Sequence, residues 1–360
     1  MDYMSAKEAA EKWHITQRRV AILCAENRIP NAEILGNMWL IPADAEKPAD
    51  GRSIKINKDK KAKPFVKWAG GKTQLIDEIS KRFPDGFGTK IVKYAEPFVG
   101  GGAVFFEVLS KYSLEEIFIG DINEDLINCY QIIKKEPEGL IETLQSMQND
   151  FLSLEPNNRK EYFYEKRSLY NHVKFNYSCD MQLARTALFM FLNKTCFNGL
   201  YRVNSKGLYN VPMGAYKNPL ICDTENILAV SEKLQNVKIH CGDFRESAEF
   251  IDKDTFVYFD PPYRPLSNTS GFTSYTQDAF TDEQQKDLAA YYKALSSRGS
   301  KLLLSNSDPK NHDTSDNFFD DLYEGFRIDR VEAVRMINSK VTGRGKIKEL
   351  LIFNYEVNEK

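Results

Sequence analysis

Asp260 ends a short apolar run and is followed by two prolines and a tyrosine. The run from Phe256 to Phe259 is apolar and aromatic without polar alternation, which predicts a buried β-strand. Because prolines cannot donate to a strand ladder, Pro261 and Pro262 are expected to end this strand at Asp260. Ligands of open α/β sheets bind where the strands end. Asp260 is therefore the first candidate for a side chain that does chemistry.

The residues from Asp260 to Tyr263 suit a reaction at the exocyclic amine of a base. Such an amine is a poor nucleophile, because its lone pair is delocalised into the ring. The Asp260 carboxylate and the Pro261 carbonyl can both accept its N–H bonds and so aim the lone pair at an electrophile. Pro262 stiffens this turn, and Tyr263 offers a ring face on which a base can stack. An ordinary β-turn, with Asp and Pro in favoured positions, is the competing structural interpretation.

A glycine turn and a second carboxylate predict a nucleoside site. A predicted strand over 94–96 leads into the glycines 100–102 and then into a helix over 104–109. Asp121 ends the next predicted strand, 20 residues after the middle glycine, where its carboxylate can bond a ribose hydroxyl. An unrelated pair of α/β turns would have the same pattern. Paired glycines before Lys72 give a weaker sign of close approach to a ligand, without the spacing of a phosphate-binding P-loop.

Residues 124–200 are predicted to be mainly helical, and a polar hairpin follows them. Helices are expected over 126–133, 140–147, 161–169 and 182–191. The stretch from Leu200 to Pro212 then predicts a hairpin, with its turn at 205–207. Aromatic, amide and basic side chains interleave there, as they do in contacts to base edges and phosphates. An ordinary surface hairpin is the alternative.

Further strands and a basic loop complete the expected α/β pattern. A helix is expected over 282–295, and strands are expected over 237–240, 301–304, 331–334 and 350–355. The loop over 338–346 is basic and rich in glycine. Its Arg344 and Lys346 are candidates for contacts with a nucleic-acid backbone.

Residues 1–48 predict a separate module, which a polar and basic linker over 49–63 joins to the rest. Two helices, the first with a capping-box start, precede a tight hairpin over 32–41. Helix, turn, helix and hairpin is the outline of a winged helix-turn-helix, which would direct Arg18 and Arg19 at a major groove. A helical module that binds only protein is the alternative, because acidic residues dilute its charge.

The composition is that of an ordinary globular protein, and its overall charge does not indicate binding to nucleic acid. The chain has 360 residues, 42% hydrophobic and 28% charged, with a net charge of -2 and a pI of about 6.2. Six cysteines lack C-x-x-C spacing and four histidines are dispersed, so no metal site is expected. Without a signal-peptide pattern or an apolar run of membrane-spanning length, the protein is expected to be cytoplasmic.

With these segments in order, residues 64–355 resemble the Dam-type DNA adenine-N6 methyltransferases. That family has a Trp-Ala/Thr-Gly-Gly-Lys segment, a Phe-x-Gly segment, a recognition region and Asp-Pro-Pro-Tyr, which stand here at 68–72, 98–100, 131–235 and 260–263. The hairpin residues carry a closer likeness to enzymes that methylate adenine in GATC or related GAT-containing sites. The module over 1–48 resembles MerR-like or excisionase-like helix-turn-helix modules, which compact members of the family lack.

The resemblance implies an α/β fold, with a Rossmann-like class I S-adenosylmethionine-dependent methyltransferase sheet. The catalytic domain would comprise 64–130 and 236–360, with a mainly helical DNA recognition domain inserted over 131–235. The methyl donor would be S-adenosylmethionine, the product S-adenosylhomocysteine and the substrate double-stranded DNA.

The resemblance also assigns roles to individual residues. The catalytic residues it implies are Asp260, Pro261, Pro262 and Tyr263. The cofactor-binding residues are Trp68, Lys72, Phe98, Gly100, Asp121, Asp243, Phe244 and Asp260. The candidates for contact with DNA, including those named above, are Lys67, Asn198, Leu200, Arg202, Asn204, Asn210, Pro212, Arg344, Lys346, Arg18 and Arg19.

The expected activity is site-specific methylation of adenine N6 in duplex DNA. The setting would be a restriction-modification system with a cognate endonuclease, or a solitary methylase. Transfer to cytosine N4 is one alternative, because its amine chemistry is the same, and transfer to RNA or to a protein side-chain amide is another. A DNA-binding regulator that keeps a silent methyltransferase fold is the alternative from a different class.

Overall fold

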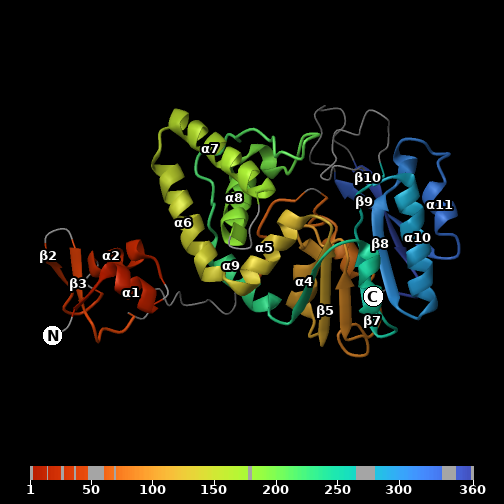
Figure 1. Cartoon of the computed structure of the whole chain (residues 1–360). Helices are drawn as coiled ribbons and strands as arrows, with labels where there is room; N and C mark the ends of the chain where they lie inside the picture. Colours follow the sequence, from red (N-terminus) through yellow and green to blue (C-terminus); the bar gives the residue numbers. More distant parts are fainter. Residues whose placement is uncertain are drawn as a thin grey trace. The chain divides into compact units, whose positions relative to one another are not determined.

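The computed structural model describes residues 3–13, 15–25, 28–35, 38–47, 61–68, 70–176, 181–264, 280–334 and 346–357. The chain divides into two compact units, Met1–Asn57 and Lys58–Lys360 (Figure 1). No helix in the described ranges is both long and apolar enough to cross a membrane.

The first unit contains the two helices and the hairpin that the sequence predicts. Its elements are β1 (Tyr3–Ser5), α1 (Ala6–Trp13), α2 (Gln17–Ala25), β2 (Glu33–Leu35) and β3 (Met38–Pro42). The capping box is present, because the Ser5 amide donates to the Glu8 carboxylate at 2.7 Å and the Glu8 amide donates to the Ser5 hydroxyl at 3.3 Å. Strand β1, which the sequence did not predict, pairs antiparallel with β3. The DNA-binding role of this unit stays a prediction.

The second unit is built on a seven-stranded, mostly parallel sheet in the order β6-β5-β4-β7-β8-β10-β9. Its strands are β4 (Lys93–Glu96), β5 (Glu116–Asp121), β6 (Val237–Cys241), β7 (Thr255–Phe259), β8 (Lys301–Ser307), β9 (Arg327–Val334) and β10 (Lys346–Phe353). The five strands β4 to β8 run parallel to one another, and β10 runs antiparallel to both of its neighbours, β8 and β9. From β4 the chain proceeds outward to β5 and β6, and from β7 it proceeds the other way to β8. The strands β4 and β7 therefore flank the point where ligands of such sheets bind.

Helices cover both faces of this sheet, which explains the apolar run in β7. Phe256 and Tyr258 pack on one face with residues of α3 (Ile76–Ser80), α4 (Ala103–Lys111) and α5 (Glu124–Lys135). Val257 and Phe259 pack on the other with α10 (Asp282–Ser297) and α11 (Phe318–Leu322). All of β7 is buried, because a parallel strand covered on both faces has no polar side.

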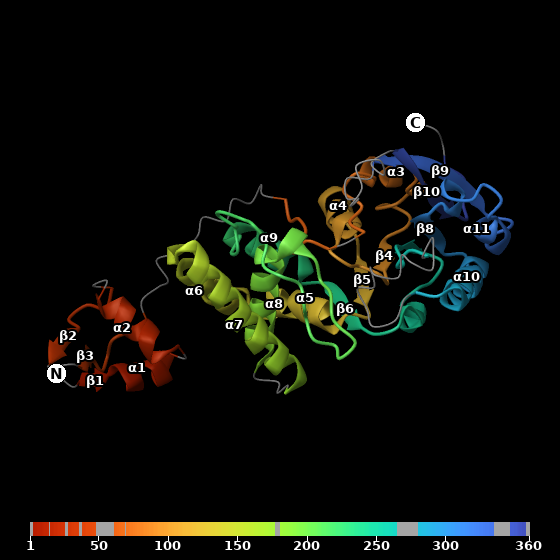
Figure 2. The same ribbon diagram turned by 90° about the horizontal axis from the view of Figure 1, so that it is seen from above.

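A group of helices packs together next to α5, and a hairpin lies with them (Figure 2). These helices are α6 (Pro137–Ser153), α7 (Pro156–Phe175), α8 (Gln182–Thr195) and α9 (Thr224–Leu234). The predicted helices are confirmed but run further than expected, and α9 was not predicted as a separate element. Cross-strand pairing of Val203 with Tyr209 shows the hairpin. These helices share one apolar core with α4, α5 and a sheet face, so the division into catalytic and recognition domains stays a prediction.

Truncating a core residue of β10 should destabilise the second unit. The Ile352 side chain is 0% exposed, so Ile352→Ala is expected to lower the free energy of unfolding by about 2–5 kcal/mol, measured by urea denaturation. Leu220 is 59% exposed, and Leu220→Ala should change that free energy by no more than about 0.5 kcal/mol. Equal effects of the two substitutions would contradict the packing described.

Candidate active site

Asp260 lies directly after β7 and forms an ion pair with Lys72. The Lys72 Nζ lies 2.6 Å from the Asp260 Oδ1, and the Lys72 side chain is only 4% exposed. Lys72 also donates to the Gly70 carbonyl at 2.9 Å, and the Ser305 hydroxyl donates to the Asp260 Oδ1 at 3.1 Å. Among the described residues, no hydrogen bond or ion pair reaches the second oxygen, Oδ2. One carboxylate oxygen is thus held by the protein, and the other is available to a ligand.

Burial sets the protonation of the two carboxyl groups at this point. It raises the pKa of the Asp260 carboxyl above its ordinary value, although the Lys72 charge and the Ser305 hydrogen bond favour the ionised form. Glu96, at the end of the neighbouring strand β4, is 2% exposed and accepts a hydrogen bond from the Tyr94 hydroxyl at 2.6 Å. Its pKa lies well above the usual range because it is buried and because Asp260 is charged. Lys72 therefore faces one carboxylate and one carboxyl group that favours its neutral form.

Tyr263 is held from two sides. Its hydroxyl donates a short hydrogen bond to the Glu349 carboxylate, and the Lys72 Nζ lies 4.6 Å from the centre of its ring. Glu349 comes from β10, where it pairs with Ser307 of β8. No sequence motif indicated Glu349, whose only signal was a charged residue at the edge of an apolar strand.

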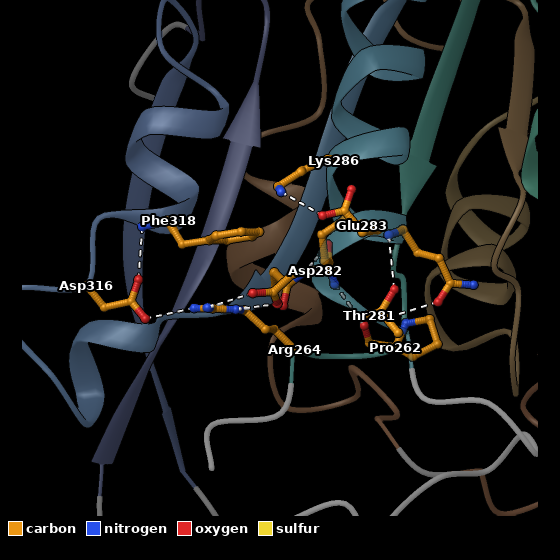
Figure 3. A network of polar contacts seen from close by, with 11 residues as sticks. Pro262, Arg264, Thr281, Asp282, Glu283, Lys286, Asp316 and Phe318 are labelled. Atoms are coloured by element: carbon orange, nitrogen blue, oxygen red, sulfur yellow. Dashed lines mark hydrogen bonds and ion pairs between the residues drawn. The ribbon is translucent and has the colours of Figure 1, made fainter. Parts of the chain in front are cut away.

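Arg264, directly after Tyr263, anchors the end of the segment 260–264 (Figure 3). Its guanidinium donates to both carboxylate oxygens of Asp282, at 2.7 and 3.0 Å, and to Asp316 at 2.7 Å. It also lies over the Phe318 ring, 4.1 Å from the ring centre. A bidentate pair of this kind fixes direction as well as distance. The segment 260–264 therefore has a defined position relative to the start of α10, a support that no sequence pattern indicated.

A second carboxylate, Asp121, ends the parallel strand β5. Its side chain accepts hydrogen bonds from the Gly100 amide at 3.1 Å and the Asn123 amide at 2.8 Å. Burial raises the pKa of this carboxyl from 3.8 to about 6, although these hydrogen bonds oppose the shift. Because β5, β4 and β7 are neighbouring parallel strands, Asp121 and Asp260 reach the same edge of the sheet.

The glycine turn after β4 is packed against Trp68. Gly100 has a φ of +49°, and a Cβ there would lie 3.0 Å from the Trp68 Cδ1. Gly102 has a φ of +75°, and a Cβ there would lie 2.6 Å from the Tyr130 hydroxyl. The Tyr130 hydroxyl donates to the Gly100 carbonyl at 3.1 Å. Glycine is therefore required by backbone conformation and by space at both positions.

Aromatic rings line the same edge beyond β4 and β6. Phe98 and Phe244 are stacked, with ring centres 5.4 Å apart and planes at 29°. Asp243 precedes Phe244, but its carboxylate is occupied by the Arg245 guanidinium at 2.7 and 3.1 Å and by the Arg245 amide at 2.9 Å. Arg245 holds the pKa of the Asp243 carboxyl below its usual range. The role of Asp243 beside a bound ligand stays a prediction, since its visible role is to cap the 3₁₀ helix Phe244–Glu249.

The hairpin presents polar side chains outward and tyrosines inward. Arg202 is exposed and donates to the Asn210 side chain at 2.7 Å. The Asn204 side-chain oxygen accepts backbone hydrogen bonds at 3.0 Å from two residues of the turn, which gives it a structural role. Tyr201 and Tyr209 are buried.

The remaining candidates for contact with DNA fall in four groups. Lys67 and Asn198 are exposed. They lie close together, because the Asn193 side chain forms hydrogen bonds with the backbone of Lys67 and of Gly199, the residue after Asn198. Leu200 and the exposed Pro212 lie at the two ends of the hairpin. Arg344 and the side chain of Lys346 lie outside the described residues, and Arg18 and Arg19 belong to the first unit.

The sheet and this edge fit a class I methyltransferase. Residues 68–337 match the family model of D12 class N6 adenine-specific DNA methyltransferases, and the chain belongs to this family. It is 52% identical over 295 residues to the type II methyltransferase M.MjaIII of Methanocaldococcus jannaschii, a match that covers 81% of this chain and 99% of that one.

Two further relatives carry names of the same kind. The DNA adenine methylase of Haemophilus influenzae is 38% identical over 292 residues, or 81% of this chain and 93% of that one. The DNA N-6-adenine-methyltransferase of Escherichia phage P1 is 32% identical over 355 residues, or 94% of this chain and 43% of that one. These matches favour adenine over cytosine as the methylated base.

Asp121 should make stability depend on pH. Because the pKa of its carboxyl is about 6 in the folded protein, against 3.8 for an ordinary Asp, the folded chain keeps a proton that the unfolded chain has released between these values. Its contribution to stability therefore falls as pH rises through this window, by up to about 3 kcal/mol. Asp121→Asn should gain stability relative to the wild type between pH 4 and 7, by about 1–3 kcal/mol in urea unfolding.

The matched control is Asp254→Asn, whose parent side chain is 49% exposed. Its difference from the wild type should change little over the same pH range. A pH-independent difference for Asp121→Asn would contradict the raised pKa of the Asp121 carboxyl.

Proposed function

We propose that the protein transfers a methyl group from S-adenosylmethionine to the N6 amine of adenine in double-stranded DNA, at GATC or a related GAT-containing site. Membership of an adenine-specific family supports the base and the polymer. The observation that carries the proposal is the arrangement of Asp260, whose Oδ1 is held by Lys72 while Oδ2 stays available. The proposed site in DNA rests on the likeness of the hairpin to GATC-methylating enzymes.

The edge formed by β4, β5 and β6 fits S-adenosylmethionine. Gly100 and Gly102 carry no side chain, so the backbone of this turn can approach a ligand closely. Asp121 lies beside this turn and can accept hydrogen bonds from a ribose diol, and Phe98 and Phe244 offer apolar aromatic surface for an adenine ring. When bound, S-adenosylmethionine supplies the methyl group that is transferred.

The protein's own residues would position the target amine. The Asp260 Oδ2 and the Pro261 carbonyl accept its N–H bonds and localise the nitrogen lone pair. Lys72 fixes the Asp260 rotamer and favours the charged form of its carboxyl. Tyr263, with Lys72 over one face and Glu349 at its hydroxyl, offers its other face to an adenine flipped out of the duplex. Catalysis would then consist mostly of positioning and local electrostatics.

The proposed contacts with DNA come from both units. The outward side chains of the hairpin, Arg202 among them, would read base edges, and Lys67 beside Asn198 would contact phosphate or bases. In the first unit, the exposed Arg18 at the start of α2 would contact a major groove. The relative named type II methyltransferase is consistent with a restriction-modification setting that includes an endonuclease partner. The relative named DNA adenine methylase is equally consistent with a solitary methylase.

Methyl transfer to two short duplexes tests the proposal. Both carry GATC in the same flanking sequence, and in the control duplex the GATC adenines are already N6-methylated. With labelled S-adenosylmethionine, the first duplex should accept label at least about a hundredfold faster than the second, because the target amine of the second already carries its methyl group. Digestion of the product should yield N6-methyladenine. Equal labelling of the two duplexes would place the target outside GATC, and N4-methylcytosine would overturn the choice of base.

A further inference from the structure

A buried ion pair lies between the hairpin region and the cofactor side of the sheet. Asp125 of α5 is 3% exposed and Arg185 of α8 is 2% exposed, and the Arg185 Nε donates to the Asp125 Oδ1 at 2.7 Å. Removing two such charges from water is costly, and a packed apolar pair is often as stable. The proposed mechanism uses neither residue. A pair of this kind is better explained as a device that specifies one arrangement of the elements it joins.

The second carboxylate oxygen of Asp125 is bound by the hairpin. The Tyr201 hydroxyl donates to Asp125 Oδ2 at 2.8 Å. Lys174 of α7 lies 3.3 Å from the same oxygen and donates to the Tyr201 hydroxyl at 2.9 Å. Burial acts to raise the pKa of the Asp125 carboxyl, but the charges of Lys174 and Arg185 outweigh it, and the pKa lies below its usual range. One charged carboxylate on α5 therefore ties together α7, α8 and the hairpin.

The ring of Tyr201 makes a second connection, to the glycine turn. It stacks on Trp68, with ring centres 5.6 Å apart and planes at 27°. Trp68 in turn lies against Gly100, where an added Cβ would be 3.0 Å from its Cδ1. The next residue along the hairpin, Arg202, is exposed and is a candidate for contact with DNA. Tyr201 is therefore next in sequence to a proposed DNA contact, and its ring stacks on the residue that packs against the proposed donor turn.

Both connections, from the Tyr201 hydroxyl and from its ring, end where Asp121 contacts the glycine turn. Asp125 lies in the first turn of α5, whose N-cap is Asn123. The Asn123 amide donates to Asp121, and the Asp121 carboxylate also accepts from the Gly100 amide. The hydroxyl of Tyr201 thus reaches Asp121 through α5, and its ring reaches Gly100 through Trp68.

We propose that Tyr201 is a positioning residue that couples DNA binding at the hairpin to methyl-donor binding at the glycine turn. This inference rests on the proposed function. When a bound duplex already holds the hairpin in place, donor binding loses no further conformational entropy in ordering it. Each ligand therefore strengthens binding of the other. By linkage, the duplex tightens donor binding and the donor tightens duplex binding by the same factor.

Tyr201→Phe isolates this role. The substitution removes the hydroxyl that bonds Asp125 and Lys174 and keeps the ring that stacks on Trp68. The matched control is Tyr209→Phe, in the same hairpin. Tyr209 is also buried, but its hydroxyl donates to the Leu200 carbonyl at 3.1 Å. Both variants lose one oxygen from one buried tyrosine, and only the first loses the bond to Asp125.

The measurement is the affinity for S-adenosylhomocysteine by calorimetry, with and without a saturating GATC duplex. In the wild type, the duplex should tighten binding by about fivefold or more. In Tyr201→Phe this factor should fall below about twofold, while affinity without DNA stays within about twofold of the wild type. Tyr209→Phe should keep the wild-type factor. Duplex affinity measured with and without S-adenosylhomocysteine should give the same factors, because linkage makes the coupling reciprocal. A merely structural role would weaken one or both affinities and leave the factor unchanged.

Four outcomes would overturn the proposal. They are a wild-type factor near one, an unchanged factor in Tyr201→Phe, an equal loss in both variants, and a Tyr201→Phe protein that does not fold while Tyr209→Phe does. The last would make the hydroxyl a requirement for folding. A wild type that methylates neither duplex or does not bind S-adenosylhomocysteine would show failure of the proposed function itself, and this inference would fall with it.

Discussion

The ion pair between Lys72 and Asp260 is the interaction on which the candidate site depends. A carboxylate that is largely shielded from water at the end of a strand is costly unless it is paired and hydrogen-bonded. Lys72 at 2.6 Å and the Ser305 hydroxyl supply both partners on Oδ1. The pair joins the loop before α3 to the end of β7 and leaves Oδ2 available beside the rigid turn at Pro261. The same ammonium lies over the Tyr263 ring, so one buried cation organises both the acceptor of the amine and the surface for the base.

The sheet explains why these groups meet. Parallel strands covered on both faces end at a common edge of the sheet. Asp121 and Asp260 therefore lie at the same edge, although they are far apart in sequence. The antiparallel strand β10 brings Glu349 to the Tyr263 hydroxyl, and Arg264 ties the segment after β7 to the start of α10. Each of these supports uses a charged group with several polar contacts, which limits the orientations that the turn after β7 can adopt.

Local patterns predicted the elements well, and long-range partners poorly. The apolar run of β7 and the glycine turn were readable because both faces of a parallel strand are buried and because Gly100 and Gly102 have positive φ. Helix ends were misjudged, since packing extends α7 well beyond its apolar pattern, to Phe175. No local pattern pairs Glu349 with Tyr263 or Asp125 with Tyr201. These contacts depend on strand register and helix packing, which a single sequence does not encode at short range.

The role of Asp260 is tested most directly by the single-turnover rate of methyl transfer in Asp260→Ala, with duplex binding and thermal unfolding measured on the same protein. Because this change leaves Lys72 buried without its carboxylate, the double variant Lys72→Met/Asp260→Ala serves as the control for folding. Both variants are expected to fold and bind duplex within about threefold of the wild type, while the transfer rate falls at least about a hundredfold. A folded Asp260→Ala protein that transfers methyl within about tenfold of the wild-type rate would contradict a catalytic role of Asp260 and leave it as a structural residue of the turn.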